Sequence, residues 1–592
     1  MKSEIAQLLT AAVRSLKGSL LHAPVDPGVV QLERPRDASH GDFASNVALR
    51  LAKAAGRNPR EIAAAIIAAL PANKLIAKTE IAGAGFINFH LRQEVALSVV
   101  AEVLQRGDQF GRVAIGEQSR KILLEFVSAN PTGPMHVGHG RQAAYGDALG
   151  RVLEAAGNRV FREYYINDAG RQVDILAVSV WIRYLEACGE TLVFPANGYR
   201  GDYLLPVAAG LHERQGQALR RPAAAVLAGL PADAPAGDKE KYIDALIARM
   251  RELLGSGNFE LVKIFSLETM MTEIREDLAA FDVRFDRWTS EREFNDSGAI
   301  DAAIERLRNK DLLYEKDGAQ WFRASAFGDD EDRVVVRDNG VKTYFAADIA
   351  YHLAKRERGF DVLIDVLGAD HHGYVTRVRG GLQAFGHPGE CLEACLIQLV
   401  SLYRDGVKLS MGKREANFVT LRQLREEVGN DACRLFYLMR GNDQPLDFDL
   451  ELAKKKSDEN FVYYIQYAHA RVSSVARELK ARGIAYDAVA APAAMADPTA
   501  AAALGNEHAQ ALLTLLARYP EQIQTAAANR APHAIVHFLR ALANGLHSWY
   551  NADRWLVEDV ALRTPRLALA FAVQQVLRNG LQLLGASAPD SM

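Results

Sequence analysis

The chain has 592 residues, enough for about two to four domains, and 49% of them are apolar, 24% charged and 8% aromatic. This composition is typical of globular proteins and excludes disordered, collagen-like and coiled-coil chains. The chain has 70 Lys and Arg and 73 Asp and Glu, so its net charge is −3. This balance excludes nucleic-acid binding that is driven by an overall excess of basic residues. Four Cys are too few for a disulfide framework, and we find neither a signal peptide nor an apolar run of membrane-spanning length. We therefore expect a multidomain cytoplasmic protein that does not bind membranes.

Residues 1–115 predict a small α+β domain. Helical periodicity covers residues 44–55 and 60–70, and residues 86–91 alternate between apolar and polar side chains as a strand does. The domain ends in the polar stretch 107–120.

Residues 116–450 predict an α/β domain with a Rossmann-like, doubly wound parallel sheet. Short apolar runs at 122–127, 160–166 and 362–367 alternate with helices, one of them over 138–156. Residues at about 190–260 are rich in Gly, Pro and Ala, which indicates an insertion between two halves of the sheet. Residues 451–592 predict an all-α helical bundle, in which apolar stripes flank an Ala/Pro linker at 488–500.

The first chemical motif runs from a strand through a Pro/Gly loop into a helix that starts near Gly138. The free amides of that first turn favour anions, and His136 and His139 lie on the same side of it, where they can donate hydrogen bonds to phosphate oxygens. Gly138 and Gly140 would let a ligand approach the backbone. The same residues fit a dinucleotide fingerprint with Glu163 as the ribose acid, but about ten residues separate it from its strand, which disfavours that interpretation. A metal site on the two histidines has no evident third ligand.

The second motif reads as two short strands joined by Asp405-Gly406, a strong hairpin signal, followed by a loop that carries Lys413 and Arg414. A phosphate-binding P-loop is disfavoured by the glycine spacing and by Arg414 in the place of Ser or Thr. What remains is a cationic, Gly-hinged loop suited to neutralising a departing pyrophosphate; a solvated turn is the plainer alternative.

Together these motifs resemble the signatures of class I aminoacyl-tRNA synthetases. The run His136-Val-Gly-His139 resembles the His-Ile-Gly-His signature, and Ser410-Met-Gly-Lys413-Arg414 resembles the Lys-Met-Ser-Lys-Ser loop. Four further stretches look like arginyl-tRNA synthetases, as does the layout of the whole chain: residues 128–131, 167–172, 344–348 and 368–373. The loop departs from its pattern, since Ser410 replaces the first Lys and Gly412 the Ser, with Lys408 near enough to substitute.

The resemblance implies that ATP activates arginine as arginyl-adenylate, which then transfers to tRNA. Its partners would be L-arginine, ATP with Mg²⁺, and tRNA(Arg); we expect a monomer without a protein-bound metal. The resemblance assigns the phosphates and ATP to His136, Gly138, His139, Gly368, Asp370, Lys408, Met411 and Lys413. It assigns arginine to Glu125, Asn130, Tyr344, Asp348 and His372.

The chemistry of the guanidinium supports one part of this assignment. A guanidinium is a planar, permanently charged donor, so its pocket needs a carboxylate and further acceptors. Asp348 follows Tyr344 by one helical turn, which places a carboxylate beside an aromatic ring on one helix face. The alternative is a surface ion pair of Asp348 with Lys342 or Lys355.

For tRNA, the resemblance points to Asn46 in the N-terminal domain. Helical spacing places Tyr464, Tyr467 and Arg471 on one helix face that could stack on unpaired bases, and core packing of the tyrosines is the alternative. Two other classes remain open. Asp370-His371-His372 with Cys391 and Cys395 would suit a metal-dependent nucleotidyl hydrolase, although the apolar stretch between the cysteines favours a buried helix. A non-catalytic RNA-binding protein would need neither histidine nor Lys413.

Overall fold

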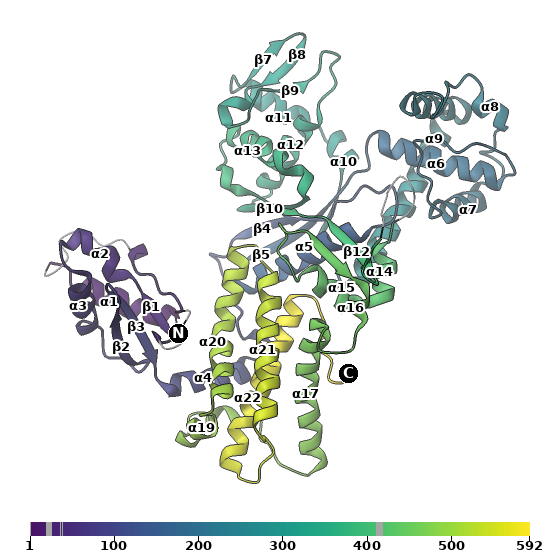
Figure 1. Ribbon diagram of the computed structural model, residues 1–592. Coiled ribbons are helices and arrows are strands. Elements are labelled where there is room, and N and C mark those ends of the chain that lie inside the picture. Colours follow the sequence, from purple (N-terminus) through teal and green to yellow (C-terminus); the bar gives the residue numbers. More distant parts are fainter. Residues whose placement is uncertain (1, 19–26, 36, 38–39, 410–417) are drawn as a thin grey trace. The chain divides into compact units, whose positions relative to one another are not determined.

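The computed structural model describes residues 2–18, 27–35, 37, 40–409 and 418–592. The chain forms two compact units, and Figure 1 shows its helices and strands in sequence colours. The first unit comprises Met1–Phe110, Val472–Arg518 and Asn544–Val576, and the second comprises Gly111–Arg471, Tyr519–Ala543 and Leu577–Met592.

The N-terminal part of the first unit is a three-stranded antiparallel sheet covered by helices. The strand order is β1-β3-β2, with bounds Phe43–Ser45, Phe86–Leu91 and Ile76–Ala82. The covering helices are α1 (Lys2–Ser15), α2 (Val47–Ala55) and α3 (Pro59–Ala68). The next helix, α4 (Gln93–Arg106), packs on α18 (Ala491–Ala494) and α19 (Pro498–Ala503). The strand expected at 86–91 is confirmed as β3. The helix expected from residue 44 begins at Val47 instead, because residues 43–45 pair with the strand β3.

The second unit is built on a five-stranded parallel sheet, as the sequence predicts. Its order is β11-β10-β4-β5-β6, with bounds Leu392–Ile397, Val362–Gly368, Lys121–Glu125, Arg159–Ile166 and Arg287–Ser290. The order reverses where β10 meets β4, and open sheets of this kind bind ligands beyond the carboxyl ends of the strands at such a reversal. The helix expected at 138–156 is α5 (Val137–Ala155).

Further elements of this unit surround the sheet (Figure 1). A small antiparallel sheet consists of β7 (Leu313–Lys316), β8 (Ala319–Phe322) and β9 (Arg333–Val336). A third, mixed sheet pairs β12 (Val400–Arg404) with β13 (Val407–Lys408) in antiparallel fashion and with β14 (Leu446–Asp449) in parallel. The helices beside them are α10 (Glu291–Asp296), α11 (Ala299–Arg308), α12 (Tyr344–Glu357), α13 (His372–Ala384), α14 (Leu421–Val428), α15 (Asn430–Tyr437) and α16 (Leu450–Lys454).

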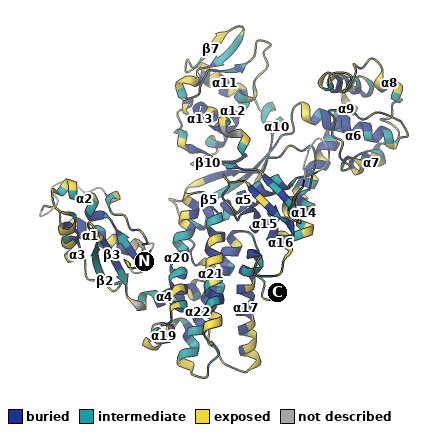
Figure 2. Ribbon diagram, in the orientation of Figure 1, coloured by how far each residue is buried: buried dark blue, intermediate teal, exposed yellow. Residues whose placement is uncertain are grey.

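The insertion is a group of helices with a core of its own. It contains α6 (Arg171–Ala187), α7 (Leu204–Gln215), α8 (Ala223–Leu227) and α9 (Lys239–Ala280), the last broken at Gly255, where φ is 75°. Its buried residues include Trp181, Leu211, Ile243 and Met250. Figure 2 shows buried positions in dark blue along these helices.

The C-terminal residues are helical, as expected. They form α17 (Phe461–Ala481), α18 (Ala491–Ala494), α19 (Pro498–Ala503), α20 (Glu507–Ala528), α21 (His533–Ala552) and α22 (Val560–Leu583). The segment expected to be a linker at 488–500 contains α18 and the start of α19, because Asp497 caps the helix that begins at Pro498. In the described residues, we find no helix long and apolar enough to cross a membrane.

Candidate functional site

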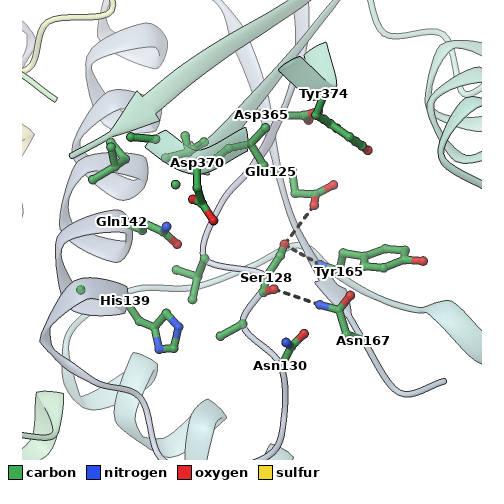
Figure 3. Close-up of a pocket in the computed structure, with 18 of the residues that line it drawn as sticks. Glu125, Ser128, Asn130, His139, Gln142, Tyr165, Asn167, Asp365, Asp370 and Tyr374 are labelled. Carbon is green, nitrogen blue, oxygen red and sulfur yellow. Dashed lines mark hydrogen bonds between the residues drawn. The ribbon is translucent and has the colours of Figure 1, made fainter. Parts of the chain in front are cut away.

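A cavity of about 1380 Å³ opens in the second unit beyond the carboxyl ends of β4 and β10. The loop after β4, the start of α5 and residues 365–370 line it, as Figure 3 shows. The helix α12 lines it as well. This is the point where the strand order reverses, so the sheet topology itself delivers side chains from distant segments to one place.

An unusual turn follows β4 and aims its side chains into the cavity. Val127 and Ser128 have φ of 69° and 39°, a left-handed conformation that is costly for a β-branched residue and is typical of functional sites. The Ser128 hydroxyl donates to Oε1 of Glu125 at 3.0 Å and accepts the amide of Tyr165 at 3.0 Å. The Asn167 amide donates to the Ser128 carbonyl at 3.0 Å, as Figure 3 shows. The turn is therefore held by its own strand, β4, and by the end of the neighbouring strand β5.

His136 and His139 lie together at the start of α5. Their rings stack with centroids 3.7 Å apart, and both line the cavity. The amide of Gly138 donates to Nδ1 of His136 at 3.0 Å, and the amide of His136 donates to Nδ1 of His139 at 3.4 Å. Because each Nδ1 is an acceptor, the neutral rings carry their proton on Nε2. Each histidine can then donate from Nε2 at the positive end of the helix.

The two glycines of this motif differ in what they face. Gly138 lines the cavity, as expected of a residue that lets a ligand approach. Gly140 is buried, and a β-carbon there would lie 2.8 Å from Leu421 and from the Tyr437 hydroxyl. The ligand role expected for Gly140 is therefore wrong, because this glycine allows α5 to pack closely on its neighbours.

The far end of the cavity is acidic. Tyr344 and Asp348 both line it from the first turns of α12, and Glu291 lines it from α10. Burial raises the pKa of Asp348 to about 6, although His352 and a hydrogen bond from Tyr374 oppose that rise. Burial, with the charges of Asp168 and Asp348, raises the pKa of Glu291 to about 7. Two carboxyl groups thus share a confined space in which a cation would be stabilised.

The ion pairs suggested for Asp348 are not formed. Lys342 pairs with Asp301 at 2.6 Å, and the ammonium of Lys355 contacts Glu125 at 2.6 Å and Asp365 at 3.1 Å. The carboxylate of Asp348 therefore faces the cavity without either lysine.

Glu163 cannot serve as the ribose acid of a dinucleotide site. Its side chain is completely buried, accepts from the hydroxyl of Tyr351 at 2.8 Å and pairs with Arg358 at 2.6 Å. The dinucleotide alternative therefore loses the ribose-binding carboxylate that it requires.

The second motif forms the hairpin that the sequence predicts. Residues Val400–Arg404 and Val407–Lys408 pair in antiparallel fashion, and Asp405 and Gly406 have φ of 50° and 75°, as a tight two-residue turn requires. Lys408 is exposed on β13 and is not among the described residues that line the cavity. Met411 and Lys413 lie outside the described residues.

The remaining predicted residues fall into two groups. Asn130, Gly368 and Asp370 line the cavity with Glu125. The side chain of His372, at the start of α13, lies outside the described residues, as does that of His371.

Within the described part of the chain, no three His, Cys, Asp or Glu side chains are arranged to hold a metal ion. The helix expected between Cys391 and Cys395 is wrong: both are buried, but the segment runs into β11, which pairs with β10.

The residues expected to contact tRNA lie elsewhere. Asn46 precedes α2 in the first unit. In the second, Tyr467 is exposed on α17, with its ring stacked on Tyr463 at 5.8 Å and the Arg471 guanidinium 4.8 Å from its centroid. Tyr464 is half-buried on the same helix.

Sequence reasoning missed several residues that line the cavity. Glu291, Gln142, Tyr165 and Leu399 all do so. Gln142 follows His139 by three residues and could have been found from helical spacing. Glu291 offers no such signal, because only the fold of β6 and α10 brings it opposite Asp348.

Comparison with known proteins matches three family models along the chain. They are the arginyl tRNA synthetase N terminal domain at residues 3–91, the catalytic domain of class I (R) tRNA synthetases at 99–189, and the DALR anticodon binding domain at 465–592.

Curated relatives match over the full length of both chains. The arginine–tRNA ligase of Thioalkalivibrio sulfidiphilus is 53% identical over 596 residues, and that of Legionella pneumophila strain Paris is 51% identical over 594 residues. The solved arginyl-tRNA synthetase of Thermus thermophilus has the same fold, with a TM-score of 0.73 and 22% identity over all of both chains. With the cavity at the sheet reversal and half of all positions shared over its whole length, the chain belongs to the arginyl-tRNA synthetase family.

Proposed function

We propose that this protein catalyses the reaction that names its relatives, arginine–tRNA ligation. It activates L-arginine with ATP and transfers the arginyl group to the 3′ end of tRNA(Arg). The observation that carries this proposal is the cavity itself. One end is a helix N-terminus with two histidines suited to phosphate, and the other holds Asp348 and Glu291, suited to a cation.

Arginine fits the acidic end in one orientation. Asp348 accepts hydrogen bonds from the guanidinium, the ring of Tyr344 lies beside it on the same helix face, and Glu291 adds a second acceptor. The α-amino group then reaches Glu125 and Asn130 at the end of β4. The α-carboxylate is left pointing toward the helix N-terminus, where ATP binds.

In the first step a carboxylate oxygen of arginine attacks the α-phosphorus of ATP. The new P–O bond gives arginyl-adenylate, and the bond to the β-phosphate breaks to release pyrophosphate. No proton transfer is needed, so the protein contributes position and charge stabilisation. The Nε2–H groups of His136 and His139 donate to the phosphate oxygens, and Lys413 with Lys408 neutralises the leaving pyrophosphate.

ATP occupies the part of the cavity bounded by Gly138, Gly368 and Asp370, and we propose that Met411 contributes to its binding. Mg²⁺ enters as the ATP complex and keeps phosphate and water ligands, because this ion gives up water reluctantly.

In the second step a ribose hydroxyl of the tRNA attacks the arginyl carbonyl. The bond between the carbonyl carbon and the phosphate oxygen breaks, AMP leaves, and the hydroxyl proton passes to a phosphate oxygen of the departing AMP. For tRNA we propose contacts at Asn46 and at the surface formed by Tyr464, Tyr467 and Arg471, where aromatic rings can stack on unpaired bases. We propose a monomer. We place it in the cytoplasm because the four cysteines are free thiols, as in a reducing compartment.

Arginine-dependent exchange of pyrophosphate into ATP tests the proposal, with and without tRNA(Arg). We expect exchange with arginine and none with lysine, which carries a charge but no planar fork. Hydrolysis of nucleotides without arginine would favour the nucleotidyl hydrolase, and tRNA binding without exchange in either condition would favour a non-catalytic RNA-binding protein.

A further inference from the structure

Beneath the cavity, three carboxylates lie in one row across three neighbouring strands. Asp365 on β10 is the register partner of Glu125 on β4, which is in turn the partner of Glu163 on β5. Register partners on parallel strands point to the same face of the sheet. The side chains of Asp365, Glu125 and Glu163 are 5%, 12% and 0% exposed. Like charges so close and so buried repel each other strongly unless cations lie among them.

One stripe of α12 supplies most of the compensating groups. Asp348, Tyr351, His352 and Lys355 occur at spacings of three, one and three residues, which places them on one helix face. The Tyr351 hydroxyl bridges Glu125 at 2.9 Å and Glu163 at 2.8 Å. Nε2 of His352 contacts Oδ2 of Asp365 at 2.7 Å, while its Nδ1 lies 2.8 Å from the carbonyl of Asp348. Together these two contacts fix the ring of His352 against Asp365.

Lys355 occupies the centre of this arrangement. Its side chain is completely buried, and its ammonium contacts Oε2 of Glu125 at 2.6 Å and Oδ1 of Asp365 at 3.1 Å. Burial alone would lower the pKa of Lys355, but Asp365 and Glu125 outweigh that effect and raise it, so the ammonium stays charged. The ammonium also lies 4.3 Å from the centroid of the Tyr351 ring.

The contacts of Glu125 divide between its two oxygens. Oε2 is occupied by Lys355 and Tyr351, whereas Oε1 accepts only the Ser128 hydroxyl among the contacts observed in the described residues. Fixing Oε2 from below therefore leaves Oε1 turned toward Ser128 and the cavity that Glu125 lines.

We propose that Lys355 is a positioning residue for arginine binding: it holds the Glu125 carboxylate in the orientation that receives the α-ammonium group of the substrate. The inference rests on the proposed function, because it takes arginine as the ligand. Lys355 does not touch the substrate; it acts through Glu125.

The test compares arginine with δ-guanidinovalerate, the analogue that lacks the α-amino group, by titration calorimetry of the full chain. An ammonium contact with a buried carboxylate should make the wild-type Kd for the analogue about 10- to 150-fold higher than for arginine. In Lys355→Met this ratio should fall to about threefold or less, and Lys355→Arg should restore part of it. The KM for ATP in pyrophosphate exchange should stay within about threefold of wild type, since the ATP end of the cavity is untouched.

Arg358→Met is the matched control. Arg358 is a cation that contacts the same row of carboxylates, but it is half-buried and pairs with Glu163 at 2.6 Å and not with Glu125. Its loss should leave the ratio unchanged. If Arg358→Met lowers the ratio as much as Lys355→Met does, or if Lys355→Met keeps the wild-type ratio, the proposal is overturned.

A double variant protects the test against misfolding of Lys355→Met. Glu125→Gln with Lys355→Met removes both members of the Lys355–Glu125 ion pair, and Asp365, which also loses its contact with Lys355, keeps its contact with His352. If Lys355 acts through Glu125, the double variant has the same ratio as Glu125→Gln alone; a further fall contradicts the proposal. Failure of the proposed function would look different, since the wild-type chain would then show no preference for arginine over lysine.

Discussion

Replacing Asp348 with Asn should make the protein more stable and less able to bind arginine. Burial raises the pKa of this carboxyl to about 6, from an ordinary value of 3.8. The folded chain therefore holds the proton up to about pH 6, whereas the unfolded chain loses it near pH 4. Between these values the charged form costs the folded state an increasing amount of free energy, which levels off above pH 6 at about 3 kcal/mol at most. Asn has the same shape and no charge, so at pH 8 it should raise the free energy of unfolding by about 1 to 3 kcal/mol.

Denaturant melts of Asp348→Asn and wild type at pH 8 and pH 4.5 measure this difference, with Asp447→Asn as the control. Asp447 is exposed on β14, and its replacement should change little at either pH. The gain for Asp348→Asn should shrink at pH 4.5, where the wild-type carboxyl is protonated in the folded state. In the same samples the Kd for arginine should rise about 10- to 150-fold at pH 8. A variant less stable than wild type at pH 8, with normal arginine binding, would refute the reasoning about this carboxylate.

Two further predictions concern pH and packing. Arginine binding should weaken as the pH falls from 8 to 5.5. The pKa of Glu291 is about 7 and that of Asp348 about 6, so both carboxylates take up protons in this range and no longer attract a cation. Calorimetry in two buffers of different ionisation enthalpy should show proton release on binding near pH 6.5, and a pH-independent Kd for arginine would contradict this. Gly146→Ala should lower the free energy of unfolding, measured by denaturant melts, by about 1–3 kcal/mol, because the new β-carbon would lie 2.3 Å from the ring of Phe126 beneath the turn after β4. Gly257 has open space around it, so Gly257→Ala should leave the free energy of unfolding unchanged or raise it.

Local patterns predicted much of the fold because their physical causes are local. The alternation at 86–91 and the Asp405-Gly406 turn depend on neighbouring residues only, and both are confirmed. The helix expected from residue 44 starts late because a distant strand claims residues 43–45. The apolar segment between Cys391 and Cys395 suits either a helix or a strand, and only pairing with β10 decides for the strand.

The same distinction holds for the candidate site. His136, Gly138 and His139 are adjacent in the sequence, so spacing alone brings them to one helix turn. Glu291 and Lys355 reach the site through the order and register of strands that are far apart in the chain, which no local pattern encodes.

Charging of total tRNA with each of the twenty amino acids tests the central claim most directly. The acidic end of the cavity, with Asp348 and Glu291, predicts ATP-dependent charging with arginine and at least about a thousandfold less with lysine, because a pocket of acceptors built for a planar fork is left unsatisfied by an ammonium group. Charging with another amino acid at a comparable rate, or with none, would contradict the account.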